Sequence, residues 1–318
     1  MKISVVVCTY NRSQVLLKAL ESIAVQNIPQ SVQWDVLVVD NNSSDQTREV
    51  MERYCNQSPD RFNYILESKQ GLSHARNAGI EKSRGDVVAF TDDDAIVEPD
   101  WLWNLTSSLG RGEWAGAGGR IIPVWSGALP KWLSNDELNS IGTYGGFYLG
   151  PEAGPLTRPF YGGNMAIRRE ALERYGGFRV DLGRSSNNLQ GREDVELANR
   201  LFAAGEQLRY EPNAVIRHPV AESRMTKSYV LRWHYWDGRS EIADTGQFEK
   251  GPSIMGVPFV QIRRLLRWTL QAMVSISPQK RFFCQRNVWI LAGYIVSSYH
   301  SFRHRDTRTQ ASTRVPSE

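Results

Sequence analysis

The feature that most constrains the fold is a regular alternation of apolar runs and helical stripes over the first hundred residues. The runs are short and β-branched, and the stripes repeat every third or fourth position, which is typical of strand–helix–strand units. The predicted strands are 3–8, 35–39, 63–66 and 86–91, and the predicted helices are 13–26, capped by Ser13, 45–55 and 73–82. This order predicts an α/β fold with a Rossmann-like, mostly parallel sheet and helices on both faces.

Polar residues follow three of these strands, at Thr9, Asp40 and Asp92. Because ligands of parallel sheets bind beyond the carboxyl ends of the strands, we expect these residues at one binding edge. Asp92 also begins the run Asp92-Asp93-Asp94, whose charges repel one another unless a cation neutralises them. On an extended chain Asp92 and Asp94 face one ion while Asp93 faces elsewhere, and such oxygen ligands suit Mg²⁺ or Mn²⁺. A solvated acidic turn that caps the next helix is the alternative reading of this triplet.

Composition indicates a globular protein with a proper core, because 41% of the 318 residues are hydrophobic and 23% are charged. No signal-peptide pattern is present and the three cysteines form no recognisable framework, which predicts a reducing cytoplasm. The charge is asymmetric: residues 254–318 hold ten Lys/Arg and two Asp/Glu, a net +8, and the remainder sums to −4. We therefore expect the chemistry in the acidic part, a separate role for the basic part, and no nucleic-acid partner.

The basic part contains one amphipathic pattern, with apolar residues Phe259, Ile262, Leu266 and Met273 at helical spacing. Arginines and a glutamine occupy the other side, which predicts a basic amphipathic helix within a helical tail over 246–318. The apolar side could pack on a catalytic domain over 1–245, or it could bind an anionic membrane surface through 254–318. Aromatic residues at 233, 235 and 236 fit a sugar platform, interface anchors or core packing equally.

The first predicted strand–helix turn excludes one common class of α/β enzyme. Nicotinamide-binding Rossmann proteins need Gly-x-Gly-x-x-Gly at this turn, whereas this chain has Cys-Thr-Tyr-Asn-Arg over 8–12. No Walker A sequence is present either. Residues 110–163 are rich in Gly and Trp and are expected to be mostly irregular.

Five segments in order resemble the motifs of the family 2 glycosyltransferases: 5–12, 38–45, 71–80, 91–94 and 191–197. The resemblance covers about residues 1–220. It implies the GT-A fold and an inverting transfer of sugar from a nucleotide-sugar donor to a saccharide or lipid-linked acceptor. It further implies bacterial-type polysaccharide or glycolipid assembly at the inner face of the cell membrane. There the basic tail would make this cytoplasmic protein a peripheral membrane protein.

The resemblance also implies roles for residues on the donor side. Thr9 and Tyr10 would line the nucleobase pocket, and Asp40 would accept a hydrogen bond from the base, usually uracil, so that a UDP-sugar is expected. Arg76 would reach the base or the phosphates. The alternatives are that Asp40 caps the following turn and that Arg76 is a surface helix residue.

The acidic triplet and one histidine would complete the donor site in this resemblance. Asp92 would lie near the ribose, Asp93 beside the donor, and Asp94 would hold the Mg²⁺ or Mn²⁺ on the pyrophosphate. His218 follows a predicted strand over 214–217 and would be a further metal ligand, although a lone histidine is more often structural.

The acceptor side would depend on the pair Glu193-Asp194, which begins a predicted helix. The resemblance implies that Asp194 is the catalytic base and that Glu193 contacts the acceptor or orients the loop. Gly163 and Asn164 would contact a sugar, unless they form a plain turn. Acidic residues in a first helical turn are otherwise dipole partners. A nucleotidyltransferase and a non-catalytic nucleotide-sugar-binding homologue remain the alternative functions.

Overall fold

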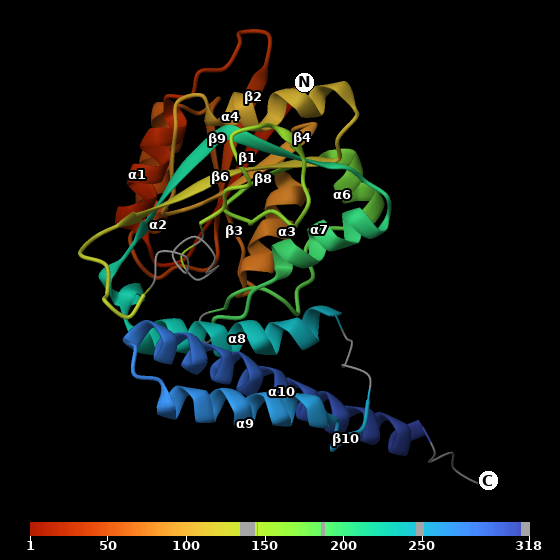
Figure 1. Cartoon of the computed structure of the whole chain (residues 1–318). Coiled ribbons are helices and arrows are strands. Elements are labelled where there is room, and N and C mark those ends of the chain that lie inside the picture. The colour runs from red at the N-terminus through yellow and green to blue at the C-terminus, as the bar shows by residue number, and fades with distance from the viewer. Residues whose placement is uncertain (134–143, 145, 186–187, 246–250, 313–318) are drawn as a thin grey trace, which may run out of the picture. The chain divides into compact units, whose positions relative to one another are not determined.

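The computed structural model describes residues 1–133, 144, 146–185, 188–245 and 251–312, with side chains as far as 303 (Figure 1). It contains two compact units. The sheet unit comprises Met1–Ala128, Asn135–Asn187 and Glu193–Glu222. The helical unit comprises Leu129–Ser134, Asn188–Arg192 and Ser223–Glu318.

The sheet unit is built on a sheet that has nine strands within the described residues, in the order β3-β2-β1-β4-β8-β6-β9-β5, with β7 paired to β9. Its parallel half matches the sequence prediction and consists of β1 Lys2–Thr9, β2 Gln33–Asp40, β3 Phe62–Leu66 and β4 Val87–Asp92. β1 lies in the centre of this half, and its apolar side chains are almost completely buried, as expected for a strand covered on both faces.

The second half of the sheet is mixed. Its strands are β5 Ile96–Val97, β6 Gly116–Trp125, β7 Gly154–Pro155, β8 Asn164–Arg168 and β9 Leu208–Val220. The prediction of mostly irregular chain over 110–163 is therefore wrong for β6. This strand pairs antiparallel with β8 and parallel with β9, so partners distant in sequence stabilise a segment that is rich in glycine.

Helices cover both faces of the parallel half, as predicted. α1 Ser13–Ala24 and α2 Thr47–Gln57 pack together on one face, and α3 Leu72–Lys82 packs against β1 and β2 from the other (Figure 1). The right-handed crossover rule gives the same assignment, because the chain reverses its direction across the sheet after β3. The remaining helical elements of this unit are α4 Trp101–Thr106, η1 Ser107–Arg111, α6 Arg169–Tyr175 and α7 Glu193–Ala203.

The start of α1 differs from its prediction. Ser13 is the first helical residue rather than the cap. Arg12 occupies the cap position, but its side chain makes no capping hydrogen bond. Asp45 supplies the acceptor instead, because its Oδ2 receives a hydrogen bond from Ser13 N at 2.9 Å. Asp45 Oδ1 also accepts bonds from Thr47 N and Oγ1, so one carboxylate serves the first turns of both α1 and α2.

We predict that Asp45→Ala lowers the free energy of unfolding by about 1 kcal/mol, the usual cost of a lost cap. Partial burial opposes ionisation, but the hydrogen bonds from Thr47 and Ser13 outweigh it and lower the pKa of Asp45. A depressed pKa contributes stability above the unfolded-state value that is lost as the pH falls through the folded-state value. Urea titrations should therefore separate wild type and variant at neutral pH and bring them together in acid. Asp60→Ala, at an exposed loop carboxylate, is the control, and equal effects of both substitutions would contradict the assignment.

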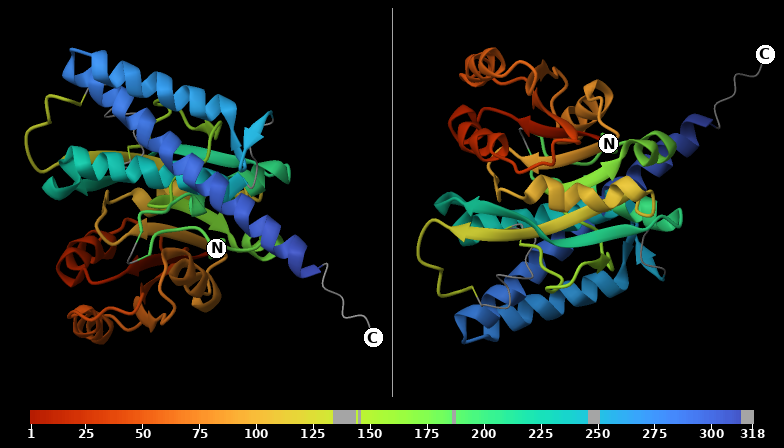
Figure 2. Two further views of the ribbon diagram at one scale, coloured as in Figure 1. Left: turned by 90° about the horizontal axis from the view of Figure 1, so that it is seen from below. Right: turned by 90° about the horizontal axis from the view of Figure 1, so that it is seen from above.

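The helical unit is a layered set of three helices, α8 Lys227–Thr245, α9 Phe259–Val274 and α10 Pro278–Ser312, preceded by the small hairpin β10 Ser253–Ile254 and β11 Val257–Pro258. α10 lies between α8 and α9, and the same order is seen from below in Figure 2. The last segment of the helical unit begins at Ser223, and within it α8 packs on α10.

Glycine allows the close approach of α8 and α10. A Cβ on Gly238 would collide with Ile290 O, and a Cβ on Gly293 would collide with Tyr235 O. Tyr235 also packs edge-on against Trp289 of α10, so this aromatic residue takes part in the contact between the two helices. Within the described residues, no helix is long and apolar enough to cross a membrane.

Candidate active site

Strand register brings the predicted polar residues to one edge of the sheet. β1 lies between β2 and β4, with Thr9 opposite Asp40 on one side and Cys8 opposite Asp92 on the other. The parallel direction of these strands places all their carboxyl ends at that edge. The sheet therefore positions these groups through register alone, before any side-chain contact is considered.

Asp92, Asp94 and His218 form a group with the composition of a metal site. Each offers one ligand atom, and these atoms lie within 4.8 Å of one another. His218 Nε2 is 3.3 Å from Asp94 Oδ1, while its Nδ1 is buried without a hydrogen-bond partner among the described residues. The donors are carboxylate oxygens and an imidazole, a set that fits a divalent cation such as Mn²⁺.

The acidic triplet divides its side chains as predicted, but through a turn rather than an extended chain. β4 ends at Asp92, and Asp93 and Asp94 lie in the turn that follows. Asp93 points away from the metal group and accepts hydrogen bonds from Thr9 Oγ1 and Arg12 Nη1, both at 2.7 Å. Burial raises the pKa of Asp93 to about 6, although the charge of Arg12 opposes the shift.

Arg12 is a site residue that the sequence prediction missed. Its Nη1 bridges Asp93 Oδ1 at 2.7 Å and Asp94 Oδ2 at 2.9 Å, so one guanidinium offsets part of the repulsion within the triplet. Asn11 precedes it with a positive φ of 52°, a left-handed conformation that Asn tolerates. The available signal was its position: Arg12 lies just beyond the end of β1, the strand paired with β4.

Arg76 of α3 connects the metal group to the acidic pair of α7. Its side chain is 5% exposed, and Nη1 donates to Glu193 Oε1 at 2.7 Å. Its Nη2 is 3.8 Å from Asp92 Oδ1. Both carboxylates that face the Arg76 guanidinium therefore belong to this chain. The resemblance implies that Arg76 reaches a base or a phosphate, and the structure does not present it for such a contact.

Two glycines make room for this arrangement. A Cβ on Gly162 would collide with the Arg76 guanidinium, and a Cβ on Gly163 would lie 2.5 Å from Asp92 Oδ2. Gly163 thus borders Asp92 of the metal group. The space next to Gly162 is filled by Arg76 and the space next to Gly163 by Asp92, and the contact of Gly163 with a sugar stays a prediction.

The two acidic residues of α7 have different environments. Glu193 is buried, and burial together with the charge of Asp194 raises the pKa of Glu193 against the opposing effect of Arg76. Asp194 is only partly buried, and its Oδ2 accepts a hydrogen bond from Gly162 N at 2.6 Å. Asp194 is therefore the accessible carboxylate of the pair, whereas Glu193 holds Arg76.

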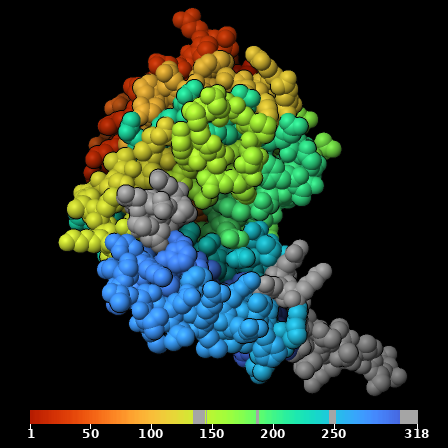
Figure 3. Space-filling view, in the orientation of Figure 1, coloured from red at the N-terminus to blue at the C-terminus, as the bar shows by residue number. Residues whose placement is uncertain are grey.

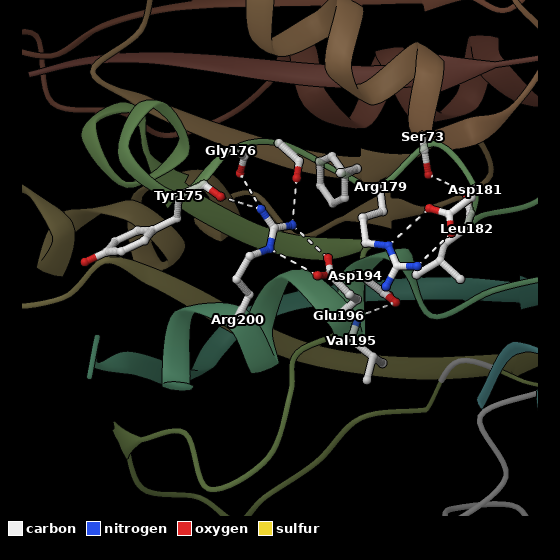
Figure 4. A network of polar contacts seen from close by, with 12 residues as sticks. Ser73, Tyr175, Gly176, Arg179, Asp181, Leu182, Asp194, Val195, Glu196 and Arg200 are labelled. Carbon is white, nitrogen blue, oxygen red and sulfur yellow. Dashed lines mark hydrogen bonds and ion pairs between the residues drawn. The ribbon is translucent and has the colours of Figure 1, made fainter. Parts of the chain in front are cut away.

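A polar network fixes the helix that carries Asp194 (Figure 4). Arg200, on the same helix, donates through Nη2 to Glu196 Oε2 at 2.7 Å and to Gly177 O at 2.8 Å. Its Nη1 donates to the carbonyl of Tyr175 at the end of α6. The Asp194 Oδ1 accepts a bond from the next backbone amide at 2.8 Å, so both carboxylate oxygens are oriented.

Of the predicted nucleobase contacts, the structure leaves one open to solvent. Tyr10 is 38% exposed. Thr9 is buried, with its hydroxyl on Asp93. Asp40 is 2% exposed and accepts bonds from Ser43 N at 2.8 Å and Tyr64 Oη at 2.9 Å. Asp40 thus caps the turn after β2, and the structure does not present it for the contact with a base that the resemblance implies.

Asn164 is not available to a sugar, contrary to the prediction. It is 1% exposed at the start of β8. Its Oδ1 accepts a hydrogen bond from Trp101 Nε1 at 2.8 Å, and its Nδ2 donates to the carbonyls of Arg120 and Ala214. Every polar hydrogen of this amide is therefore satisfied inside the sheet unit, where it joins α4, β6 and β9.

The family assignment follows from comparison with known proteins. The family model described as "Glycosyl transferase family 2" matches residues 4–176. The chain is 28% identical over 239 residues to the succinoglycan biosynthesis protein ExoM of Rhizobium meliloti, covering 75% of this chain and 73% of that protein. It is 29% identical over 250 residues to a glucosyl-dolichyl phosphate glucuronosyltransferase of Haloferax volcanii, covering 76% of each.

A solved structure supports the same conclusion for the fold. The mannosyltransferase PcManGT from Pyrobaculum calidifontis, in complex with GDP-Man and Mn²⁺, superposes with a TM-score of 0.59 at 21% identity. The match covers 98% of this chain and 79% of that one. This protein belongs to glycosyl transferase family 2, and the predictions of a GT-A fold and of a glycosyltransferase are confirmed.

We predict that Arg76→Met lowers the free energy of unfolding by about 3–5 kcal/mol, because it leaves Glu193 buried and unpaired. Adding Glu193→Gln should recover more than half of this loss, since the stranded charge is then removed. Urea unfolding of the two single variants and the double variant measures the coupling. Arg48→Met, which removes an exposed pair with Glu52, is the control and should cost less than about 1 kcal/mol. Simple additivity of the two substitutions would show that the pair does not couple α3 to α7.

Proposed function

We propose that this glycosyltransferase transfers a sugar, with inversion, from a nucleotide-diphosphate donor to a hydroxyl of a saccharide or lipid-linked acceptor. The observation that carries the proposal is the juxtaposition around Arg76. This one guanidinium lies between Asp92 of the metal group and Glu193, the neighbour of Asp194. An inverting transfer needs a positive charge near the leaving diphosphate and a carboxylate near the acceptor. Arg76 connects the metal group, which would hold that positive charge, to Glu193, which is next to the carboxylate of Asp194.

On the donor side, Asp92, Asp94 and His218 would hold the divalent cation. A cation bound there neutralises the charge that develops on the nucleoside diphosphate as it leaves. Mn²⁺ fits the donor set better than Mg²⁺, because Mg²⁺ prefers oxygen ligands and the group includes an imidazole. Arg12 would hold Asp93 away from the ion, and the exposed ring of Tyr10 offers a surface on which a nucleobase can stack.

On the acceptor side, Asp194 would act as the general base. It takes the proton of the attacking hydroxyl as that oxygen forms the new bond to the anomeric carbon. Gly162 N fixes the orientation of its Oδ2, and the Arg200 network fixes the helix. Glu193 would orient the loop that carries Asp194 through its ion pair with Arg76. This is the second of the two roles that the resemblance implies for Glu193.

The donor nucleotide and the acceptor are inferred from different sources. The motif resemblance favours UDP, whereas PcManGT was solved with GDP-Man, so both nucleotides belong in a first screen. The name of the Haloferax relative specifies a lipid-linked acceptor. We propose a similar acceptor here, used in glycan assembly at the cytoplasmic face of the cell membrane.

The first test concerns the metal. Thermal unfolding of the wild type with UDP or GDP should show a stabilisation that depends on Mn²⁺. Asp94→Asn should abolish this metal-dependent shift, and His218→Asn should weaken the response to Mn²⁺ more than the response to Mg²⁺. Asp60→Asn, an exposed carboxylate, is the control. An Asp94→Asn protein with an unchanged response to Mn²⁺ would remove this residue from the metal site.

The second test concerns the base. Asp194→Asn keeps the shape of the side chain but cannot accept the proton, so turnover should fall by about 10²–10⁴. Donor affinity measured by calorimetry should remain within error of wild type, because Asp194 is assigned to the acceptor. Glu173→Gln makes the same change at an exposed carboxylate of the sheet unit and should leave turnover unchanged. Loss of donor affinity with turnover retained would refute the role.

A further inference from the structure

α9 exposes an apolar stripe that its own unit does not cover. Its residues recur at spacings of three, four and seven, which places them on one side of a helix. Their exposed fractions run from 48% for Phe259 to 93% for Ile276, which lies in the turn after the helix. The α9 stripe consists of Phe259, Leu266, Leu270, Met273, Val274 and Ile276.

The opposite side of α9 contacts the rest of the helical unit. Gln261 is buried, and the ring of Trp268 packs edge-on against Phe283 of α10, with centroids 5.6 Å apart. This docking fixes the rotation of α9 about its axis. The stripe is therefore turned outward, and Figure 3 shows α9 on the outer surface of the helical unit.

Basic residues border the α9 stripe. Arg263, Arg264 and Arg267 are exposed along α9, and Lys280 and Arg281 are exposed at the start of α10, directly after the turn. The sequence has no Asp or Glu from 251 to 305. No carboxylate within this stretch therefore repels an anionic surface from the α9 stripe.

We propose that the α9 stripe and the turn after it bind the surface of a lipid bilayer that contains anionic lipids. Apolar side chains would enter the boundary between headgroups and acyl chains, and the flanking arginines would contact lipid phosphates. A second copy of this chain is the other candidate partner for the α9 stripe. Charge disfavours it, because a symmetric contact would bring the same arginines of both copies together.

This inference does not depend on the proposed transfer reaction, since it concerns only the helical unit. It gives the stripe a function in a protein whose relative in Haloferax acts, by name, on a lipid-linked sugar. An enzyme held reversibly at the bilayer surface would meet such an acceptor by diffusion in two dimensions. Membrane binding and catalysis can therefore be tested, and can fail, separately.

The experiment is flotation of the full chain with phosphatidylcholine vesicles, with and without about one-third phosphatidylglycerol. We expect binding to the anionic vesicles that decreases with added salt, and little binding to the neutral ones. Changing Arg263, Arg264 and Arg267 together to Gln should lower the partition coefficient about 100-fold. The matched control carries Lys18→Gln, Arg84→Gln and Arg111→Gln, three exposed basic residues of the sheet unit, and should bind like wild type.

A second pair of variants tests the apolar contribution. The triple change Leu266→Gln, Leu270→Gln and Met273→Gln keeps good helix formers and should lower the partition coefficient at least about 10-fold. Its control makes the same kind of change at exposed apolar residues of the sheet unit, as Val25→Gln, Leu66→Gln and Val180→Gln. Circular dichroism establishes that each variant retains its helices.

Three results would overturn the proposal. The first is no flotation of the wild type with either vesicle, and the second is flotation that the stripe triple leaves unchanged. The third is a dimer, measured by light scattering without lipid, that the stripe triple dissociates while wild type shows no vesicle binding. That last result would assign the stripe to a second copy of the chain.

Discussion

The geometry of the site depends on one buried guanidinium. Arg76 comes from α3 on one face of the sheet, and it joins Asp92 at the end of β4 to Glu193 at the start of α7. A buried charge of this kind is costly unless its partners are well placed, so α7 cannot move away from the sheet without exposing or stranding a charge. Gly162 leaves the space that the guanidinium fills, and its amide holds Asp194. One ion pair thus relates the position of the proposed base to that of the proposed metal ligands.

Local pattern was enough to predict the half of the fold that carries the donor side. Periodicity identified β1 to β4 and the helices between them, and parallel register then required Asp40 and Asp92 to lie at the same edge. β6 could not be predicted in this way. Its glycines at 116, 118 and 119 suggested a loop, yet side chains there would collide with Ala166 O, Phe160 and Ala214 O. Glycine in this strand reflects close packing by partners from distant parts of the chain.

Several contacts of the predicted site residues were not foreseen from the sequence. Asp40, Arg76 and Asn164 are the polar types expected at a binding site. Their hydrogen-bond partners, Tyr64, Glu193 and Trp101, lie 24, 117 and 63 residues away and come from other elements of the sheet unit. A sequence pattern indicates which residues carry polar groups, whereas only the fold determines whether those groups face a ligand or one another. Many of these polar side chains hydrogen-bond to one another and hold the site in place. Tyr10, Asp92 and Asp194 are more exposed.

The two units differ in the chemical groups that they contain. The sheet unit contains carboxylates that suit cation binding and proton transfer. The helical unit has basic residues beside an exposed apolar stripe. Each unit has its own internal packing, which for the helical unit depends on glycine contacts between α8 and α10. A change in the surface of one unit can therefore leave the chemistry of the other intact.

We propose that one cation site and one base, related through Arg76, form a single active site. Crystals grown with Mn²⁺ and a nucleoside diphosphate, measured at the manganese absorption edge, test it most directly. We expect one anomalous peak within about 2–2.3 Å of the Asp94 and His218 ligand atoms, with the diphosphate bound to the ion and Arg76 still paired to Glu193. A peak elsewhere, or Arg76 released from Glu193 to bind the diphosphate, would contradict it.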